Sequence, residues 1–266
     1  MIKFKSLSSG SCGNCYFFGS FSPEGHLEHA FLIDAGVSPR RAKKELQRDG
    51  IALEQVEAIL VTHDHLDHIR SLGSYCKHLK KPVWGTETLL NALSHHSMVH
   101  SWIADCRRVL KKDETEIIPG CLTARHFIVP HDATQTLGYS LDFCGCRIVV
   151  MTDIGKMTPE GLKEASEAHS VIIEANYDPW MLAHGPYPKE LQDRICSGHG
   201  HLSNGECAEA VSKFMHEGLR NVFLCHLSEH NNTPQLALEA CRKPLDGTSV
   251  RLVALPRQTP LPLTVL

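Results

Sequence analysis

The sequence lacks a long hydrophobic run. None of its apolar stretches approaches the roughly 20 residues that span a membrane, and residues 1–6 lack the apolar segment of a signal peptide. We therefore expect a cytoplasmic protein without a membrane partner. Positive charge is not in excess either. The formal net charge of −3 excludes a uniformly basic coat, so that any nucleic acid has to be bound by local groups.

The cysteines lack the spacing of a disulfide framework. There are eleven of them, an odd number, scattered along the chain, which favours reduced thiols in the core. Cys12 and Cys15 have the spacing of a redox or zinc pair, but they lie between two strand-like stretches, whereas a redox pair normally opens a helix. The loop at residues 8–14 is small and polar. It suits a tight turn, and its Ser9 and Asn14 are candidates for binding a substrate phosphate.

The hydrophobic pattern predicts a mixed α/β fold. Hydrophobic residues make up 42% of the 266, enough for a large core in one domain, residues 1–266. Strands are predicted at residues 2–7, 16–18, 30–33, 56–61, 82–84, 123–129, 137–143, 147–151, 171–174 and 222–225, and helices at 39–48, 67–79, 87–93, 189–195 and 205–217. Two similar halves of strands with outer helices predict a four-layered αββα sandwich with functional residues at one edge.

The strongest chemical signal is at residues 62–68, Thr-His-Asp-His-Leu-Asp-His, which directly follow an apolar run. Imidazole and carboxylate groups at a corner between a strand and a helix suit zinc or manganese. The turn can aim His63 and His65 to one side, while Asp67 and His68 begin the next helix and face another, so that two metal ions could lie side by side. The alternative is a solvated turn, but 18 histidines in 266 residues seldom place three within six positions.

Further strand-like stretches end in a polar residue. Three apolar stretches have the character of buried strands and end in His131, Asp153 and His226. Each strand would thus carry one metal ligand at its end. Asp34 also ends an apolar stretch, and we expect it to orient a metal-bound histidine rather than to contact metal. Its alternative role is to cap the turn before Gly36.

In this order, the motif and the strand-end residues resemble the metallo-β-lactamase superfamily, whose HxHxDH signature is followed by His, Asp and His. The resemblance covers nearly the whole chain. It implies a first metal ion held by His63, His65 and His131, a second held by Asp67, His68 and His226, and Asp153 as a bridge between them. The commonest subclass of true β-lactamases carries Cys where Asp153 stands, so the resemblance favours the hydrolase and phosphodiesterase branches. Two divalent ions are expected, zinc or manganese, with iron and cobalt as alternatives.

A finer resemblance comes from the segment between Asp153 and His226, which is too short for the large added domain of β-CASP nucleases. Its motifs EANYDP (174–179) and GHLSNG (200–205), together with SGSCGN (9–14) and HLSEHNN (226–232), resemble the YycJ (WalJ) family of small hydrolases of this fold. Members are associated with 5′-to-3′ exonuclease action on DNA and with mismatch repair. The resemblance therefore implies an exonuclease whose partner is DNA, single-stranded or at a 5′ end.

Two roles are open for the GHLSNG segment. Ser203 or Asn204 can cap a helix that starts near Gly205. In the other role, His201 and Ser203 lie over the metal pair with Asn204 beside them, and hydrogen-bond a phosphate oxygen. The two roles are compatible.

A two-metal centre suits phosphodiester hydrolysis. Ions about 3.5 to 4 Å apart would share a hydroxide that attacks phosphorus in line with the leaving oxygen. Asp67 and Asp153 would serve the centre as ligands, and His201 or a metal-bound water would protonate the leaving group. A small-molecule hydrolase, either a glyoxalase-type thioesterase or a cyclic-nucleotide phosphodiesterase, would use the same ligands on a neutral surface. A non-enzymatic scaffold is disfavoured because no ligand is missing.

Basic residues cluster at 40–48, 77–81 and 107–112. We interpret most of them as solvated helix faces balanced by nearby acidic residues. A groove lined by Arg and Lys beside the metals would distinguish a nuclease from a small-molecule hydrolase.

Overall fold

The computed structural model describes residues 1–266, which form two sets of strands and a series of mostly short helices. The first strands are β1 (Ile2–Ser8), β2 (Cys15–Phe21), β3 (Leu27–Ile33), β4 (Ala58–Leu60), β5 (Val83–Gly85) and β6 (Arg107–Val109). The later strands are β7 (Thr115–Ile118), β8 (Leu122–Val129), β9 (Thr136–Phe143), β10 (Cys146–Met151), β11 (Ser170–Glu174), β12 (Asn221–Cys225), β13 (Arg251–Ala254) and β14 (Thr264–Val265). The helices are α1 (Pro39–Gln47), α2 (Leu66–Ile69), α3 (Leu72–Leu79), α4 (Glu87–His95), α5 (His100–Ile103), α6 (Pro159–Ala165), α7 (Pro179–His184), α8 (Lys189–Ile195), α9 (Asn204–Phe214) and α10 (Pro234–Arg242).

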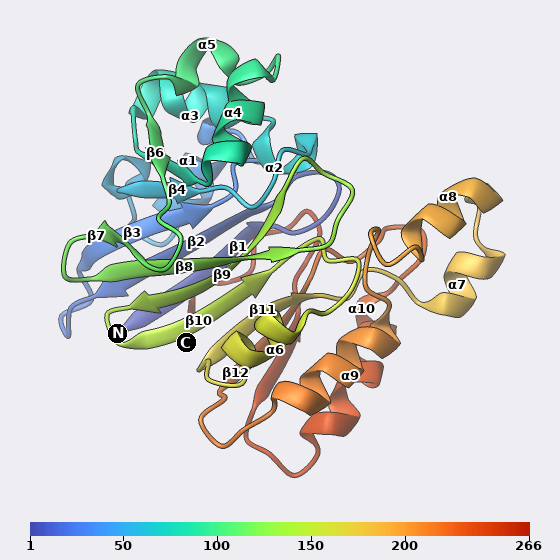
Figure 1. Cartoon of the computed structure of the whole chain (residues 1–266). Coiled ribbons are helices and arrows are strands. Elements are labelled where there is room, and N and C mark those ends of the chain that lie inside the picture. Colours follow the sequence, from blue (N-terminus) through green and yellow to red (C-terminus); the bar gives the residue numbers. More distant parts are fainter.

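The strands build two seven-stranded sheets that pack on each other. The first sheet has the order β14-β1-β2-β3-β4-β5-β6, and the second has the order β13-β12-β11-β10-β9-β8-β7. Figure 1 shows α3, α4 and α5 at one end of the view, beyond the first sheet, and α6, α9 and α10 at the other, beyond the second. This arrangement confirms the predicted αββα sandwich.

Each sheet combines antiparallel with parallel strands. β1, β2 and β3 pair antiparallel, and β3 to β6 run parallel. In the second sheet β7 to β10 are antiparallel and β10 to β13 are parallel. Neighbouring parallel strands end at the same edge of a sheet. The residues that follow β3 and β4 therefore lie together, and so do those that follow β10, β11 and β12.

Aromatic side chains join the two sheets. The ring of Phe4 on β1 lies 4.8 Å, centroid to centroid, from Phe223 on β12, and Phe31 on β3 meets Phe143 on β9 edge-on at 5.0 Å. All four rings are completely buried. Burying such a side chain stabilises a fold by roughly 1.5–3 kcal/mol. A second core packs β10 to β12 against α6, α9 and α10.

The helix predicted at residues 67–79 is wrong as one element, because it is broken after α2. The backbone N–H of Ala35 donates to the carbonyl oxygen of His68 at 2.7 Å, and the N–H of Ser71 donates to the carbonyl oxygen of Ala35 at 3.0 Å. Backbone groups at the end of α2 thus form hydrogen bonds with the loop after β3 instead of continuing the helix. The helix predicted at 205–217 ends earlier, at Phe214, because Met215 has an extended backbone.

Several elements were not predicted: β6, β7, β13, β14, α5, α6, α7 and α10. The β6 sequence, Arg-Arg-Val, is a short charged edge strand, and charge is common on sheet edges. The helices α6, α7 and α10 each begin with proline after a capping Thr or Asp, a start signal that the sequence does carry. α7 and α8 stand away from the sheets (Figure 1), and we call residues 179–195 the α7–α8 arm. No helix has the length and apolar character needed to cross a membrane.

Candidate metal centre

Three histidine rings converge beyond the end of β4. His63 is fully buried, and its Nδ1 lies 3.0 Å from the hydroxyl of Thr62. His65 Nδ1 lies 3.3 Å from His131 Nε2. The other nitrogen of His131, Nδ1, donates to the carbonyl oxygen of Gly200 at 2.7 Å, which fixes the ring. One nitrogen each of His63, His65 and His131 lies within 4.8 Å of the other two, which suits ligands of one metal ion.

A second group of three lies beside the first. Asp67 Oδ2 is 3.5 Å from His68 Nε2 and 3.3 Å from His226 Nε2. Asp67 and His68 come from α2, whereas His226 follows β12 in the other sheet. The structure therefore brings together both sets of three residues that the sequence resemblance implied.

Asp153 lies between the two groups. Its Oδ2 is 3.1 Å from His68 Nε2, and its Oδ1 is 3.2 Å from His226 Nδ1 and 3.8 Å from His131 Nε2. Its side chain is 2% exposed. One carboxylate thus reaches members of both groups, as a bridging ligand requires.

One buried atom in this cluster, His63 Nε2, has no hydrogen-bond partner, and Asp153 Oδ2 lies 3.1 Å from His68 Nε2 without hydrogen-bond geometry. A buried polar atom without a partner costs roughly 1–3 kcal/mol, so native proteins seldom leave one without a reason. Imidazole nitrogens and carboxylate oxygens are ligands of zinc, manganese and similar ions. The residues present therefore fit a divalent cation.

Burial and nearby charges set the protonation of the cluster. Burial lowers the pKa of His63, and the neighbouring His68 cation lowers it further. Burial also lowers the pKa of His226, but the Asp153 carboxylate and two hydrogen-bonded carboxylates outweigh it and raise the pKa to about 10. For Asp153, burial raises the pKa, but the cations of His226 and His68 outweigh this effect and hold it well below its usual value. The negative charge that retains these protons also attracts a divalent cation, which competes for the same nitrogens.

The chain turns sharply at three strand ends of this site. Asp34, Asp153 and His226 have left-handed backbones, with φ of 60°, 49° and 52°. Such a conformation costs a residue other than glycine roughly 1–3 kcal/mol, and it clusters at functional sites. The turn ends each strand and places its side chain among the ligands.

Asp34 lies behind His68 rather than among the ligand atoms. Its Oδ2 accepts a hydrogen bond from His68 Nδ1 at 2.6 Å, and both side chains are completely buried. Its two oxygens also accept from the backbone N–H and the hydroxyl of Thr62, each at 2.8 Å. This hydrogen bond fixes His68 with Nε2 toward Asp67 and Asp153.

Comparison with known proteins agrees with this geometry. The β-lactamase superfamily domain matches residues 29–226. The chain belongs to the β-lactamase superfamily. The exodeoxyribonuclease YycJ of Bacillus anthracis is 29% identical over 236 residues, covering 89% of this chain and 86% of that protein. The exodeoxyribonuclease WalJ of Streptococcus pneumoniae is 28% identical, covering 89% and 85%.

Solved structures show the same fold. The metallo-β-lactamase fold protein YhfI from Bacillus subtilis matches with a TM-score of 0.70 at 14% identity, over 98% of this chain and 99% of that one. The predicted resemblance to the superfamily and to YycJ and WalJ is confirmed. The chain is a metallo-β-lactamase-fold hydrolase, and its fold implies divalent metal ions.

A further acidic residue, Glu174, lies beside the candidate metal ligands. Its Oε1 accepts from His201 Nδ1 at 2.7 Å and lies 3.1 Å from His226 Nδ1, and its Oε2 accepts from the backbone N–H groups of Ile154 and Leu202. Burial lowers the pKa of His201, but the Glu174 carboxylate outweighs it, so the pKa is raised. No role was predicted for Glu174 from the sequence. It is the last residue of a buried strand, the same signal that singled out Asp153.

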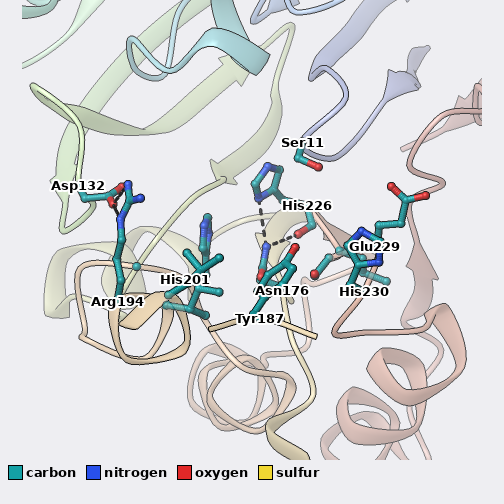
Figure 2. A pocket seen from close by; sticks show the side chains of 14 residues that line it. Ser11, Asp132, Asn176, Tyr187, Arg194, His201, His226, Glu229 and His230 are labelled. Carbon is teal, nitrogen blue, oxygen red and sulfur yellow. Dashed lines mark hydrogen bonds and ion pairs between the residues drawn. The ribbon is translucent and has the colours of Figure 1, made fainter. Parts of the chain in front are cut away.

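A cavity of about 300 Å³ opens beside the cluster. Figure 2 shows His201 and His226 among the residues that line it, with Tyr187 and Arg194 contributed by the α7–α8 arm. Arg194 is paired with Asp132, whose backbone oxygen lies 3.2 Å from His65 Nε2. The cavity therefore lies between the candidate ligands and the arm.

Ser203 and Asn204 have structural partners. The hydroxyl of Ser203 accepts from the N–H of Glu206 at 3.2 Å, and the Glu206 carboxylate accepts from the N–H of Ser203 at 2.9 Å. This capping box begins α9 and confirms the predicted capping role. Asn204 is buried and pairs with Asn232 at 2.9 Å. Neither residue lines the cavity, and their predicted phosphate contacts stay a prediction.

Ser9 and Asn14 support the ligands from the β1–β2 loop. The hydroxyl of Ser9 accepts from the backbone N–H of His226 at 3.0 Å. The amide nitrogen of Asn14 lies 3.1 Å from Asp67 Oδ2 and 2.8 Å from His68 Nε2. Both residues are fully buried and neither lines the cavity. Their predicted role in phosphate binding also stays a prediction.

Proposed function

We propose that this chain is a metal-dependent phosphodiesterase that removes nucleotides from the 5′ end of single-stranded DNA. Relatives named as exodeoxyribonucleases, 28–29% identical over 89% of the chain, support the substrate class. The observation that carries the reaction type is the pair formed by buried Glu174 and partly exposed His201 beside the candidate metal ligands. We also propose a role in mismatch repair, which rests on the family resemblance alone.

The metal ligands are proposed as two sets joined by Asp153. His63, His65 and His131 would hold one ion, and Asp67, His68 and His226 the other, zinc or manganese in each case. Divalent ions bound there would lower the pKa of a water molecule and neutralise the charge of a phosphodiester. Asp67 and Asp153 are proposed as ligands rather than as bases, because their oxygens lie among the candidate ligand nitrogens.

His201 is proposed as the proton donor to the leaving oxygen. Its Nδ1 is bound to Glu174, so its Nε2–H is the ring group left for a substrate. The Glu174 carboxylate raises the pKa of His201, which favours the protonated ring. Glu174 is a positioning residue, because two backbone N–H groups and complete burial fix its carboxylate. A positioned acid of this kind typically accelerates a reaction by 10²–10⁴-fold.

The cavity supports attack at a strand end. Its volume of about 300 Å³ is at the small end of ligand sites, which span roughly 300–1,000 Å³. It is therefore sized for one nucleotide rather than for a folded nucleic acid. Polar groups of Ser228, His230 and Arg194 line it and are suited to a phosphate and a sugar.

The test is the product pattern from 5′-phosphorylated, 3′-labelled single-stranded DNA with manganese-loaded protein. Stepwise shortening of the labelled strand is expected from the wild type and not from Asp67→Ala. Exposed His95 provides a matched control, and His95→Ala should behave as wild type. Immediate release of the labelled nucleotide would contradict the 5′ polarity. Intact DNA, with turnover of a thioester or a cyclic nucleotide, would replace the proposal by small-molecule hydrolysis.

A further inference from the structure

Three arginines surround the β1–β2 loop and are held by backbone oxygens instead of carboxylates. Arg70 Nη1 donates to the carbonyl of Cys12 at 3.3 Å, and Arg257 Nη1 donates to the carbonyl of Ser228 at 2.9 Å. Arg41 donates to the carbonyls of Leu7 and Gln258. We call Arg41, Arg70 and Arg257 the arginine rim. Arg48, Arg125, Arg147 and Arg194 are paired with carboxylates, whereas Arg107, Arg108 and Arg251, like the rim, are held by uncharged oxygens.

The arginine rim borders the metal centre. Between the rim and the ligands lies the β1–β2 loop, in which the N–H of Asn14 donates to the carbonyl of Asp67 at 2.8 Å. Ser11 of this loop and Ser228, which holds Arg257, both line the cavity. In Figure 2, Ser11 and Arg194 lie on opposite sides of His201. The cavity thus has the α7–α8 arm on one side and the β1–β2 loop, which the rim surrounds, on another.

The two sides differ in charge. On the arm, Arg194 is neutralised by Asp132. On the rim, the three guanidinium groups keep their full charge, because a carbonyl oxygen fixes a guanidinium without neutralising it. Glu229 lines the cavity and, together with Arg257, a neighbouring hollow, but no ion pair joins it to any of the three arginines. Arg70 is exposed and Arg41 and Arg257 are half-buried, so the charge is accessible to a polyanion.

We propose that the arginine rim binds the sugar–phosphate backbone of the strand beyond the nucleotide that occupies the cavity. The inference rests on the proposed function, since it assumes a nucleic acid at the metal centre. Three fixed guanidinium groups are suited to contacts with phosphates of the strand, without reading the bases. The chain as a whole carries a net charge of −3, so this local surplus of positive charge would direct the strand. The substrate is therefore an oligonucleotide of several residues rather than a mononucleotide ester.

The rim should make binding of the strand dependent on salt concentration. Each phosphate contact to a single strand contributes a salt dependence of about 0.7 in the slope of log affinity against log salt concentration. Loss of two contacts should lower the slope by about 1.4 and weaken binding by about 25-fold at 0.1 M salt. A dinucleotide, which has no phosphate over the rim, should be unaffected.

The experiment compares two double variants of equal charge. Arg70→Gln/Arg257→Gln removes two rim groups, and Arg108→Gln/Arg147→Gln removes two arginines of β6 and β10 away from the site. Binding of a 12-nucleotide strand is measured by fluorescence anisotropy at several salt concentrations, in an Asp67→Ala background that blocks cleavage. Turnover of the same strand and of a dinucleotide is measured without that background. Thermal unfolding checks that each variant is folded.

The expected result is weaker binding and a raised KM for the 12-nucleotide strand in the rim variant alone, with kcat and dinucleotide turnover unchanged. Equal losses in both double variants, or unchanged binding in both, would overturn the proposal, as would no binding of the strand to the parent protein. If the wild type binds the strand through the rim but does not cut it, the rim proposal stands and the exonuclease proposal is wrong. If the wild type cuts the strand and the rim variant binds and cuts it equally well, only the rim proposal is wrong.

Discussion

The substitution Asp34→Asn tests how the fold prepares a metal ligand. Asp34 accepts from His68 Nδ1 at 2.6 Å, which keeps a proton on Nδ1 and makes Nε2, directed at Asp67 and Asp153, the nitrogen that gives up its proton to a metal ion. In the asparagine variant, the amide oxygen can still accept from the N–H of Thr62, so the amide nitrogen takes the place of Oδ2. This nitrogen donates, and His68 Nδ1 must then accept. The proton moves to Nε2, which can no longer bind a metal ion.

The magnitude follows from the role of such partners in other metal sites. Removal of the hydrogen-bond partner of a ligating histidine typically lowers metal affinity 10- to 100-fold, which corresponds to about 1.4–2.7 kcal/mol. The loss should be confined to the ion held by His68, because Asp34 does not contact His63, His65 or His131. The exchange of one oxygen for nitrogen changes the side-chain volume little, so packing is preserved.

Zinc titration by calorimetry measures this effect. The wild type should show two sites, and Asp34→Asn should show one site of unchanged affinity and one weakened 10- to 100-fold. Asp113→Asn, at an exposed position, is the matched control. If both sites of Asp34→Asn bind zinc as tightly as in the wild type while the protein stays folded, Asp34 only caps a turn and the tautomer argument is refuted.

Three other predictions concern catalysis, packing and thiols. Glu174→Gln should lower kcat by roughly 10²–10⁴ with little change in KM, and activity should fall off at a lower pH because the carboxylate that raises the His201 pKa is gone; an unchanged pH profile would argue against His201 as the acid. Phe223→Ala should destabilise the protein by roughly 3–5 kcal/mol in urea unfolding, whereas Val109→Ala, at a half-exposed position, should have little effect. A thiol reagent should modify Cys12, Cys144 and Cys196 in the folded protein and all eleven cysteines after unfolding, and a smaller final total would reveal a disulfide.

The parts of the site that were predictable are those set by local sequence. An apolar stretch that ends in a polar residue marks a buried strand and its exit, and this signal located Asp34, His131, Asp153 and His226. The same signal is present at Glu174, which ends β11, but it lies inside the strand rather than after it and received no role. The four-layered fold followed from the repeated pattern of strands and helices.

Other features depend on tertiary contacts that no local pattern encodes. The break after α2 arises because Ala35, in the loop after β3, donates a hydrogen bond to the carbonyl oxygen of His68. The arginine rim combines residues from α1, the end of α2 and the loop after β13, which are far apart in sequence. Of the sequence clusters, 40–48 contributes only Arg41 to it. Most other residues of that cluster are exposed or bind nearby acids, as Lys43 does with Glu54, and this matches the predicted solvated helix face.

The origin of the ligands links metal binding to the packing of the sheets. His63, His65, Asp67 and His68 follow β4 in the first sheet, whereas His131, Asp153 and His226 follow β8, β10 and β12 in the second. Each proposed ion would therefore be held from both sheets. Metal affinity then depends on the free energy of keeping the two sheets packed in this relative position, and a bound ion stabilises that packing in return. The aromatic contacts between Phe4 and Phe223 and between Phe31 and Phe143 thus act on the same equilibrium as the ligands, because they fix the two sheets that carry them.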